Sequence, residues 1–332
     1  MRRWIGLLCV VALPVLTTAQ TRDVTLWITL GDSNQLVEVD AYTFKEVRRI
    51  TVDPRPHGLA ASADGSKLYL ASDQTGNFQI VDVRSGRVTA QIPLGKDPNQ
   101  MTLTDDGLFA YVPMRGEDAI AVVQLDPLRL VTKIPSPAGP HDSYAAPDSR
   151  MIYVGAQRGN AIAVVDPESR SIVETIATTD GVRPMEPASD GKRLYASLSN
   201  LLGFVVVDPA TKGVVGRVEL GSLPDGVPAP YLDTWTHSLE LVKNDRELWV
   251  TDCINDLIRI VDTRTLKEVA QIRVGHFPHW FSSRPDGRVV FVSLWFSDAV
   301  AAIDINTRKV LTNIQFARGS GPKRILVAPR VS

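Results

Sequence analysis

The sequence predicts an all-β protein, a seven-bladed β-propeller of four-stranded blades, because one short pattern recurs along the chain. An aromatic residue is followed thirteen positions later by an aspartate, at the end of an apolar, alternating run. Successive aspartates stand about forty-two residues apart, which is the length of one four-stranded blade. The pairs are Trp27 and Asp40, Tyr69 and Asp82, Tyr153 and Asp166, Tyr195 and Asp208, Trp249 and Asp262, and Phe291 and Asp304, with a seventh copy at Tyr111 that has Gln124 at the aspartate position.

The turns between the apolar runs favour strands over helices. In four copies an Asp-Gly pair precedes the aromatic residue by five positions. Asp-Gly between apolar runs is a strong hairpin signal, because glycine adopts positive φ without steric cost. Each run is also too short for a stable helix. The four turns are Asp64-Gly65, Asp106-Gly107, Asp190-Gly191 and Asp286-Gly287.

The two ends of the chain are predicted to complete one blade together. Residues 27–40 and 46–50 supply three strands of the first copy without an innermost strand, whereas 322–329 resembles an innermost strand with nothing after it. Pairing the two closes the ring and removes an open sheet edge. We therefore expect residues 20–332 to form a single propeller domain.

Residues 1–19 have the pattern of a secretory signal peptide. Arg2 and Arg3 precede an apolar run over 4–16, and small residues lead to a cleavage site after Ala19. No later apolar stretch is long enough to span a membrane. Loss of the signal removes two arginines and no acidic residue, so the net charge changes from −1 to −3. Proteins that bind nucleic acids usually carry an excess of basic residues, which this chain lacks. We expect a periplasmic or secreted monomer without a nucleic-acid partner.

Several short motifs within the copies are typical of one known repeat: Tyr111-Val112, Tyr153-Val154, Ile80-Val81-Asp82, Val164-Val165-Asp166 and Ile260-Val261-Asp262. On these motifs the chain resembles the YVTN-repeat β-propellers, secreted or periplasmic proteins with seven such blades. The resemblance covers essentially the whole mature chain and implies the same fold. The family's asparagine three residues after the tyrosine is absent, so a ligand role tied to it is not implied. The residues at that place are Ser72, Met114, Ala156, Leu198, Asp252 and Leu294.

Four of the five histidines occupy nearly the same phase of the repeat. His57, His141 and His279 each follow a proline and precede a turn aspartate by seven residues, and His237 precedes Asp245 by eight. The innermost strands of a propeller all begin at one end of the axis, here called the top face, so residues just before them converge. We expect the four imidazoles to surround the axis there.

Three interpretations of these histidines remain open. In the first, the four imidazoles bind one transition-metal ion, because imidazoles without thiolates favour copper, iron, nickel or zinc over calcium or magnesium. Glu186 or Asp142 could add a carboxylate ligand to this ion or orient one of the histidines. The ammonium group of Lys323 would repel a metal ion at this place unless an anionic molecule lies between the two cations. A ring that also contains Asn99, Glu186 and Lys323 equally suits an anionic or polyhydroxylated small molecule without a metal. In the plainest alternative, the Pro-His pairs are remnants of the repeat whose rings stack or bond to backbone.

Other candidate ligand contacts come from loops expected at the same end. The spacing from Asp208 to Asp262 is fifty-four residues instead of forty-two, and the excess over 221–235 is a proline-rich insertion of the kind that covers binding sites. Bulky aromatics also occur beside the turn at Ser297-Asp298. The predicted ligand-binding residues are Asn99, Arg115, Arg158, Glu186, Asp233, Trp235, Trp280, Trp295 and Lys323.

The predicted function is a binding module that holds a small molecule or a protein at its top face, with an axial histidine metal site as an optional part. The alternative is a metal-dependent periplasmic enzyme using copper, iron or zinc, an oxidoreductase rather than a hydrolase. The sequence lacks a phosphate-binding glycine loop, a Ser-His-Asp arrangement in a known local context, a Cys-x-x-Cys-His haem attachment and a calcium loop. Catalytic residues are therefore not assigned.

Overall fold

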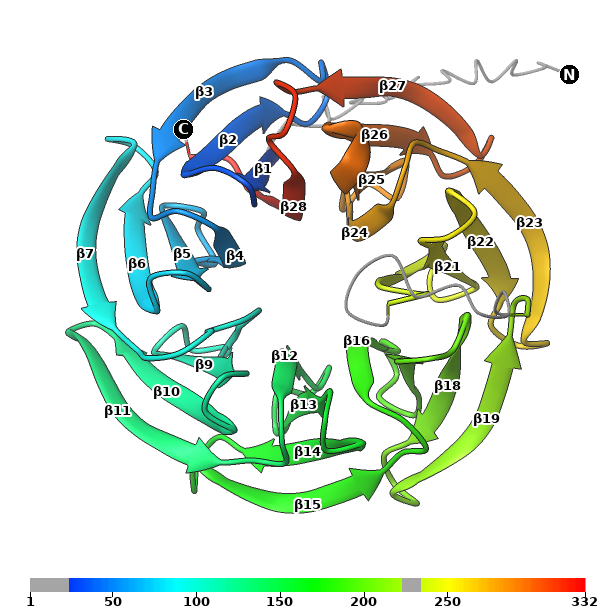
Figure 1. Ribbon diagram of the computed structural model, residues 1–332, viewed down its shortest axis with the longest axis horizontal. Coiled ribbons are helices and arrows are strands. Elements are labelled where there is room, and N and C mark those ends of the chain that lie inside the picture. The colour runs from blue at the N-terminus through cyan, green and yellow to red at the C-terminus, as the bar shows by residue number, and fades with distance from the viewer. Residues whose placement is uncertain (1–23, 223–233, 332) are drawn as a thin grey trace, which may run out of the picture.

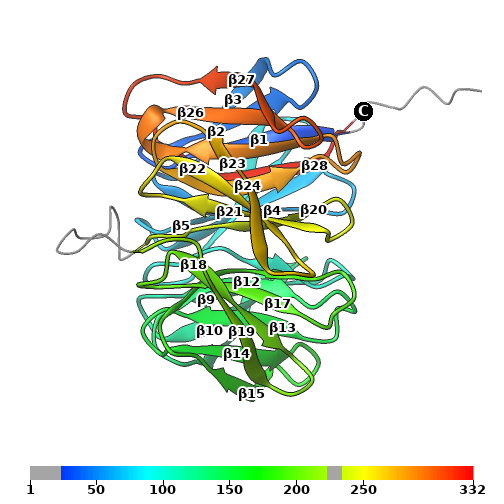
Figure 2. The ribbon, with the colours of Figure 1, turned by 90° about the vertical axis from the view of Figure 1, so that its right-hand side faces the viewer.

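The computed structural model describes residues 24–222 and 234–331 as seven four-stranded antiparallel sheets arranged in a ring (Figure 1). This confirms the predicted seven-bladed, all-β architecture. Helical structure in these ranges is one short 3-10 turn, η1 (Trp295–Ser297), and the side view shows strands throughout (Figure 2). The described residues contain no helix long and apolar enough to cross a membrane. The predicted signal peptide, Asp233 and most of the insertion lie outside them.

Each blade has the strand order innermost, second, third and outer. The first blade contains β28 (Pro322–Pro329), β1 (Val24–Leu30), β2 (Gln35–Asp40) and β3 (Glu46–Thr51). The second, third and fourth blades contain β4 (Pro56–Ala61), β5 (Lys67–Ser72), β6 (Asn77–Asp82) and β7 (Arg87–Pro93); β8 (Thr102–Leu103), β9 (Phe109–Met114), β10 (Ala119–Leu125) and β11 (Leu128–Pro135); and β12 (Pro140–Ala145), β13 (Ile152–Ala156), β14 (Ala161–Asp166) and β15 (Ser171–Ala177).

The fifth, sixth and seventh blades follow the same order. They contain β16 (Val182–Pro187), β17 (Leu194–Leu198), β18 (Gly203–Asp208) and β19 (Gly213–Glu219); β20 (Leu239–Val242), β21 (Glu247–Asp252), β22 (Leu257–Asp262) and β23 (Lys267–Arg273); and β24 (Pro278–Ser283), β25 (Val289–Leu294), β26 (Ala299–Asp304) and β27 (Lys309–Gln315).

The recurring aspartates have a local structural role. Asp82 ends the third strand of its blade, and its carboxylate accepts the backbone N–H of Ser85 at 2.7 Å. Asp64 does the same in the preceding hairpin, where Ser66 N–H donates at 3.0 Å and Gly65 has φ +71°. Both are turns in which a short acidic side chain replaces a backbone acceptor. The two aspartates of one copy therefore mark two turns, and the strand with the buried aromatic residue lies between these turns in the sequence.

The apolar core lies between the blades. Seven clusters of buried residues each join two neighbouring blades, and together they run around the whole ring. The recurring aromatics belong to them: Trp27, Tyr111, Trp249 and Phe291 are all fully buried. Because the apolar packing is supplied between the blades, the axis is free to carry polar side chains.

The chain ends close the ring as the sequence predicts. β28 pairs antiparallel with β1, so that Trp27 stands opposite Leu326 (Figure 1). Ile325 packs in the cluster between the first and seventh blades, and Ala328 packs in the cluster between the first and second. The last strand therefore contributes to two blade interfaces at once.

Truncation after Gly321 should destabilise the ring, because it removes the innermost strand of the first blade and exposes apolar surface on both sides. Burial of a side chain such as Ile325 contributes roughly 1.5–3 kcal/mol, so the loss of the whole strand should lower the Tm by about 10 °C or more. Truncation after Arg330, which keeps β28 and the ion pair to Asp40, is the control. Equal transitions for both truncations in a thermal scan would contradict the closure.

Candidate functional site

One backbone hydrogen bond recurs in every blade and sets the level of the site. The N–H of a residue at the end of the second strand donates to the carbonyl of a residue just before the innermost strand, at distances between 2.7 and 3.4 Å. The donor and acceptor pairs, from the first blade to the seventh, are Gly31 and Gly321, Asp73 and Arg55, Arg115 and Asp97, Gln157 and Gly139, Ser199 and Gly181, Cys253 and Trp235, and Trp295 and Phe277.

Two residues after each acceptor stands a buried polar side chain, at the start of an innermost strand or, for Asn99 and His237, just before it. We call these seven residues the axial ring. All of them are at most 4% exposed. The structure therefore brings the four predicted histidines to one level. In blade order the axial ring is Lys323, His57, Asn99, His141, Arg183, His237 and His279.

A β-bulge at the same level explains why two consecutive residues face the axis region. Between Pro140 and Ser143, for example, the register against β13 shifts by one residue, and β28, β4, β16 and β24 show equivalent shifts against their second strands. A bulge leaves an extra residue unpaired and changes where its side chain points. Second-strand hydroxyls accept the backbone N–H of the residue after the ring position: Thr29 from Arg324, Thr251 from Ser238, and Ser293 from Trp280.

The imidazoles lie close enough to interact. Ring centroids are separated by 6.5 Å between His57 and His141, by 6.1 Å between His141 and His237, and by 3.6 Å between His237 and His279. Within the described residues, both ring nitrogens of His57 and of His279, and Nδ1 of His237, are buried without a hydrogen-bond partner. Such atoms are rare in folded proteins and indicate either strain or a further partner such as an ion or a ligand.

Two buried carboxylates flank the ring. Asp142, which is fully buried, lies 2.9 Å from Nδ1 of His141, so Nε2 is the nitrogen of His141 that remains for another partner. Asp73 lies 3.6 Å from both Nδ1 of His57 and Nζ of Lys323. A carboxylate beside the far nitrogen of an imidazole fixes its orientation and tautomer.

Burial keeps the imidazoles neutral. It lowers the pKa of His57, His237 and His279 well below the usual 6.5. The charge of Lys323 acts in the same direction on His57 and His279. For His141, burial also lowers the pKa and outweighs the opposing effect of Asp142. Neutral imidazoles retain the lone pair that binds a metal.

In ranges 24–222 and 234–331 no three histidine, cysteine or acidic side chains enclose a point where a metal could sit. The rings of His237 and His279 lie against each other, with centroids 3.6 Å apart and planes tilted by 33°. Rotation of one of these rings is the adjustment that a shared ligand would need.

The structure corrects one position of the predicted site. In the fifth blade the ring residue is Arg183, and Glu186 lies three residues farther along β16. Arg183 was missed because Val182, not proline, precedes it. A signal was present nevertheless: Arg183 precedes Asp190 by seven residues, as Asn99 precedes Asp106. Five of the seven ring residues share this offset of seven residues to the turn aspartate, whereas three share the Pro-His pair.

The predicted aromatic contacts are largely buried. Trp295 is 6% exposed, its centroid lies 4.9 Å from that of His279, and its indole N–H donates to Asp32. Trp280 lies beside the ring, with its centroid 4.7 Å from that of His237. Trp235 is 5% exposed and packs in the cluster between the fifth and sixth blades. Alanine at Trp235 or Trp295 would therefore disturb packing as well as any ligand.

The remaining predicted contacts lie at different distances from the axis. Asn99 is a ring member, and its side-chain oxygen accepts Gln100 N–H at 2.9 Å. Arg115 is bonded to Asp97 by two guanidinium nitrogens. Arg158 is 55% exposed in its side chain and pairs with Asp118, so it belongs to the rim and not to the axial ring.

Comparisons with known proteins agree with this architecture. A family model described as the YNCE-like beta-propeller matches residues 31–236, more than half of the chain. The chain belongs to this family. The match is consistent with the YVTN-type resemblance and shows the family, but it does not by itself name a ligand. No curated protein matches the sequence.

Solved propellers of several kinds are similar in fold. Hydrazine synthase of Kuenenia stuttgartiensis has a TM-score of 0.75 at 20% identity, covering 85% of this chain and 92% of that one. The periplasmic gluconolactonase PpgL of Pseudomonas aeruginosa has 0.72 at 18% identity, covering 92% and 99%. The dihydro-heme d1 dehydrogenase NirN has 0.65 at 17% identity, covering 91% and 74%. At these identities the likeness is one of fold.

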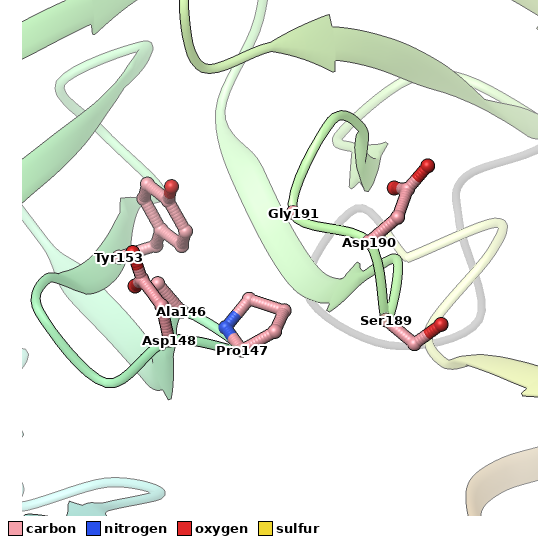
Figure 3. A pocket seen from close by; sticks show the side chains of 7 residues that line it. All are labelled: Ala146, Pro147, Asp148, Tyr153, Ser189, Asp190 and Gly191. Carbon is pink, nitrogen blue, oxygen red and sulfur yellow. The ribbon is translucent and has the colours of Figure 1, made fainter.

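The opposite end of the strands presents a different surface. A cavity of about 310 Å³ lies there between the hairpin turns of the fourth and fifth blades (Figure 3). It contains no axial-ring residue. Its lining is Ala146, Pro147, Asp148, Tyr153, Ser189, Asp190 and Gly191.

In metal-free protein, His57, His237 and His279 should remain neutral at about pH 6, because burial holds the pKa of each well below 6.5. Long-range ¹H–¹⁵N spectra report the protonation state, and His→Gln variants assign the signals. Below about pH 6.5 the unfolded chain binds protons that the folded chain does not, so these groups lower the free energy of unfolding as pH falls. Imidazolium ¹⁵N shifts at pH 6 would contradict the buried ring.

A residue-specific measurement is needed because buried carboxyls act in the opposite sense. Burial raises the pKa of Glu240 to about 7 and that of Glu186 well above its usual value. Their contribution to stability is full at low pH and is lost as pH rises through the raised pKa. A pH profile of overall stability would mix the two effects.

Proposed function

We propose that this protein is an exported propeller that binds a small molecule at its top face, and that the axial histidines hold one transition-metal ion there. The observation that carries the proposal is the set of buried imidazole nitrogens at one level without a hydrogen-bond partner. Leaving a buried polar atom unpaired costs about 1–3 kcal/mol. A metal ion would use the free lone pairs and remove this cost.

The chemistry of the donors selects the class of metal. Neutral imidazoles suit copper, zinc, iron and nickel, whereas calcium and magnesium require oxygen ligands. The pKa values of the four ring histidines, lowered first by burial, keep the binding form present at neutral pH. Asp142 would act through His141 by holding its orientation. Glu186 lies three residues beyond Arg183 on β16 and stays a candidate for the assisting role expected from the sequence.

A metal-dependent periplasmic oxidoreductase is the second candidate, and it would use the same four histidines. The similar structures are named as a synthase, a dehydrogenase and a lactonase, so the fold accommodates different reactions and favours none. The two candidates differ in what happens to the bound molecule, because only an enzyme would convert it to a product. An enzyme must also leave one coordination position of the metal open to its substrate.

Metal content separates the proposal from a purely structural ring. Protein purified without chelators should carry about one copper, iron, nickel or zinc ion per chain, measured by plasma mass spectrometry. His141→Ala should lose most of it, because this substitution removes a donor held by Asp142. His276→Ala is the matched control, since His276 is exposed and pairs with Asp256 outside the ring. Metal-free protein that binds none of these ions at micromolar concentration would end the metal proposal.

Export is the second part of the proposal and has its own test. It is supported by the charged start, apolar run and small-residue exit of the sequence, and one structure of similar fold is named as periplasmic. We expect a mature monomer that begins near residue 20. Intact-mass analysis of protein recovered from the periplasm or medium should show the loss of residues 1–19, whereas retention of Met1 would contradict export with cleavage.

A further inference from the structure

The cavity shown in Figure 3 has a neighbour between the same two blades. A second cavity, of about 340 Å³, lies between the fourth and fifth blades, and Tyr153 lines both. We call the two cavities together the seam groove. Its inner part is polar, with Asp148 of the fourth blade and Asp190 of the fifth on opposite sides. Its outer part is mainly apolar and is lined by Met151, Val164, Val173 and Ile176 of the fourth blade and by Pro209 of the fifth.

In other seams a bulky side chain of the following blade packs against the preceding one. It stands four positions after the aspartate that ends the third strand, in the left-handed region with φ between 54° and 60°. Phe44 lies against Phe291 of the seventh blade, with ring centroids 6.1 Å apart. The guanidinium of Arg170 lies 4.7 Å from the ring centroid of Phe109 in the third blade. Leu266 packs in the cluster between the fifth and sixth blades.

Lys212 stands at this position in the seam groove and leaves the apolar lining uncovered. Its side chain is 58% exposed and pairs with Glu174 of the fourth blade, and both residues line the outer end of the groove. Val173 is 51% exposed beside them. A larger cavity, of about 490 Å³ at the sixth-blade hairpin, is lined by charged and polar residues alone, Lys243 and Glu247 among them. The seam groove differs from that cavity because it offers an apolar surface.

The tyrosine of the fourth blade also differs from its counterpart in the third. The hydroxyl of Tyr111 donates to the carbonyl of Pro167 across the seam between the third and fourth blades, at 3.0 Å. Tyr153 and Pro209 stand at these places in the next seam, and both line the outer cavity. Within the described residues no hydrogen bond joins the two. A cavity therefore takes the place of the bond that closes the neighbouring seam.

The inner part of the groove is acidic. One carboxylate oxygen of Asp148 and one of Asp190 accept a backbone N–H within their own turns, which leaves the other oxygen of each for a ligand. Nε of Arg150 lies 4.0 Å from Asp148, and the side chain of Arg150 is 84% exposed, so this pair is a weak one. Asp245 of the sixth blade accepts the backbone N–H of Ser189, a residue of the lining, at 2.7 Å and adds a third carboxylate nearby.

We propose that the seam groove binds an extended segment of a partner protein, in which a bulky apolar residue stands next to a lysine or an arginine. The apolar side chain enters the outer cavity beside Tyr153, and the cation pairs with Asp148 and Asp190. An apolar anchor with charged neighbours is a common pattern of peptide recognition.

Exposure of the rim favours a chain over a free small molecule. The side chain of Asp148 is 63% exposed and Val173 is 51% exposed, whereas sites for small molecules usually enclose about 70–90% of the ligand surface. The groove lies at the end of the ring opposite the axial histidines, so this inference does not depend on the proposed metal site.

The test uses the folded protein and short synthetic peptides with blocked ends, in which 4-fluorophenylalanine stands next to lysine between glycine and serine residues. Both orders of the pair are made, because the groove does not fix the direction of the chain. The ¹⁹F signal of the peptide reports binding, since it shifts and broadens even in weak complexes. At least one order should bind at millimolar concentration, and the same peptides with glutamate in place of lysine should not.

Two changes to the groove should weaken this binding. The double variant Asp148→Asn, Asp190→Asn removes both charges, keeps the acceptors of the turns and should weaken binding about fivefold. Val173→Trp fills the apolar cavity from an exposed position and should weaken binding roughly tenfold. Asp106→Asn, in the same turn of the third blade, and Val269→Trp, an exposed valine at the same place of β23, are the matched controls and should bind as the parent does. Thermal scans check that every variant is folded.

Other outcomes would overturn the inference. If neither order binds, or if the glutamate peptides bind equally well, the charged and apolar parts do not act together. If the double asparagine variant and Val173→Trp both bind as the parent does, the peptide binds elsewhere. If 4-fluorobenzylamine binds as tightly as the peptide, the groove is a site for a free organic cation. A dimer in sedimentation that Val173→Trp abolishes would assign the groove to a second copy of this chain.

Discussion

The site depends on the backbone hydrogen bond that joins the end of each second strand to the start of the innermost strand. Because this bond occurs in all seven blades, the residue two positions after its acceptor arrives at the same level in every blade. The bulge that follows breaks the strict alternation of the strand. Without the bond and the bulge, a slip of one residue would turn a histidine such as His141 away from the axis.

Different residues stabilise the fold and form the candidate site. The apolar clusters lie between neighbouring blades, and the ring is closed by the pairing of the first and last strands. The axial side chains are therefore not needed to fill the core. They can carry groups that are costly to bury, such as neutral imidazoles with unpaired nitrogens and two cations. Such cost persists only where the surrounding structure holds the groups in place, and it is the physical reason to expect a ligand at the axis.

Much of this could be predicted from the sequence, because it depends on spacing. The turn aspartates and buried aromatics determine the blades, and the missing strand of the first copy is supplied by 322–329. The histidines occupy nearly the same position in each repeat, so in a propeller they are expected at the same height along the axis. The Pro-His pair did not reveal Arg183, because Val182 and not proline precedes it, although its offset of seven residues to Asp190 matches that of His57 to Asp64.

Other features could not be predicted because they depend on packing in three dimensions. Trp235 and Trp295 were expected in loops as ligand contacts, and both are buried against neighbouring blades or the ring. The stacking of His237 on His279 is a matter of side-chain torsion that no sequence interval encodes. The sharing of Asp73 among cations likewise arises from loops that are distant in sequence.

X-ray absorption spectroscopy of the metal-loaded protein tests the central claim most directly, because it reports the atoms bound to the ion. We expect nitrogen ligands at about 2.0–2.1 Å for zinc, with the multiple-scattering pattern of at least three imidazoles. A spectrum with oxygen ligands alone, or with a single imidazole, would place the ion outside the axial ring and contradict the account.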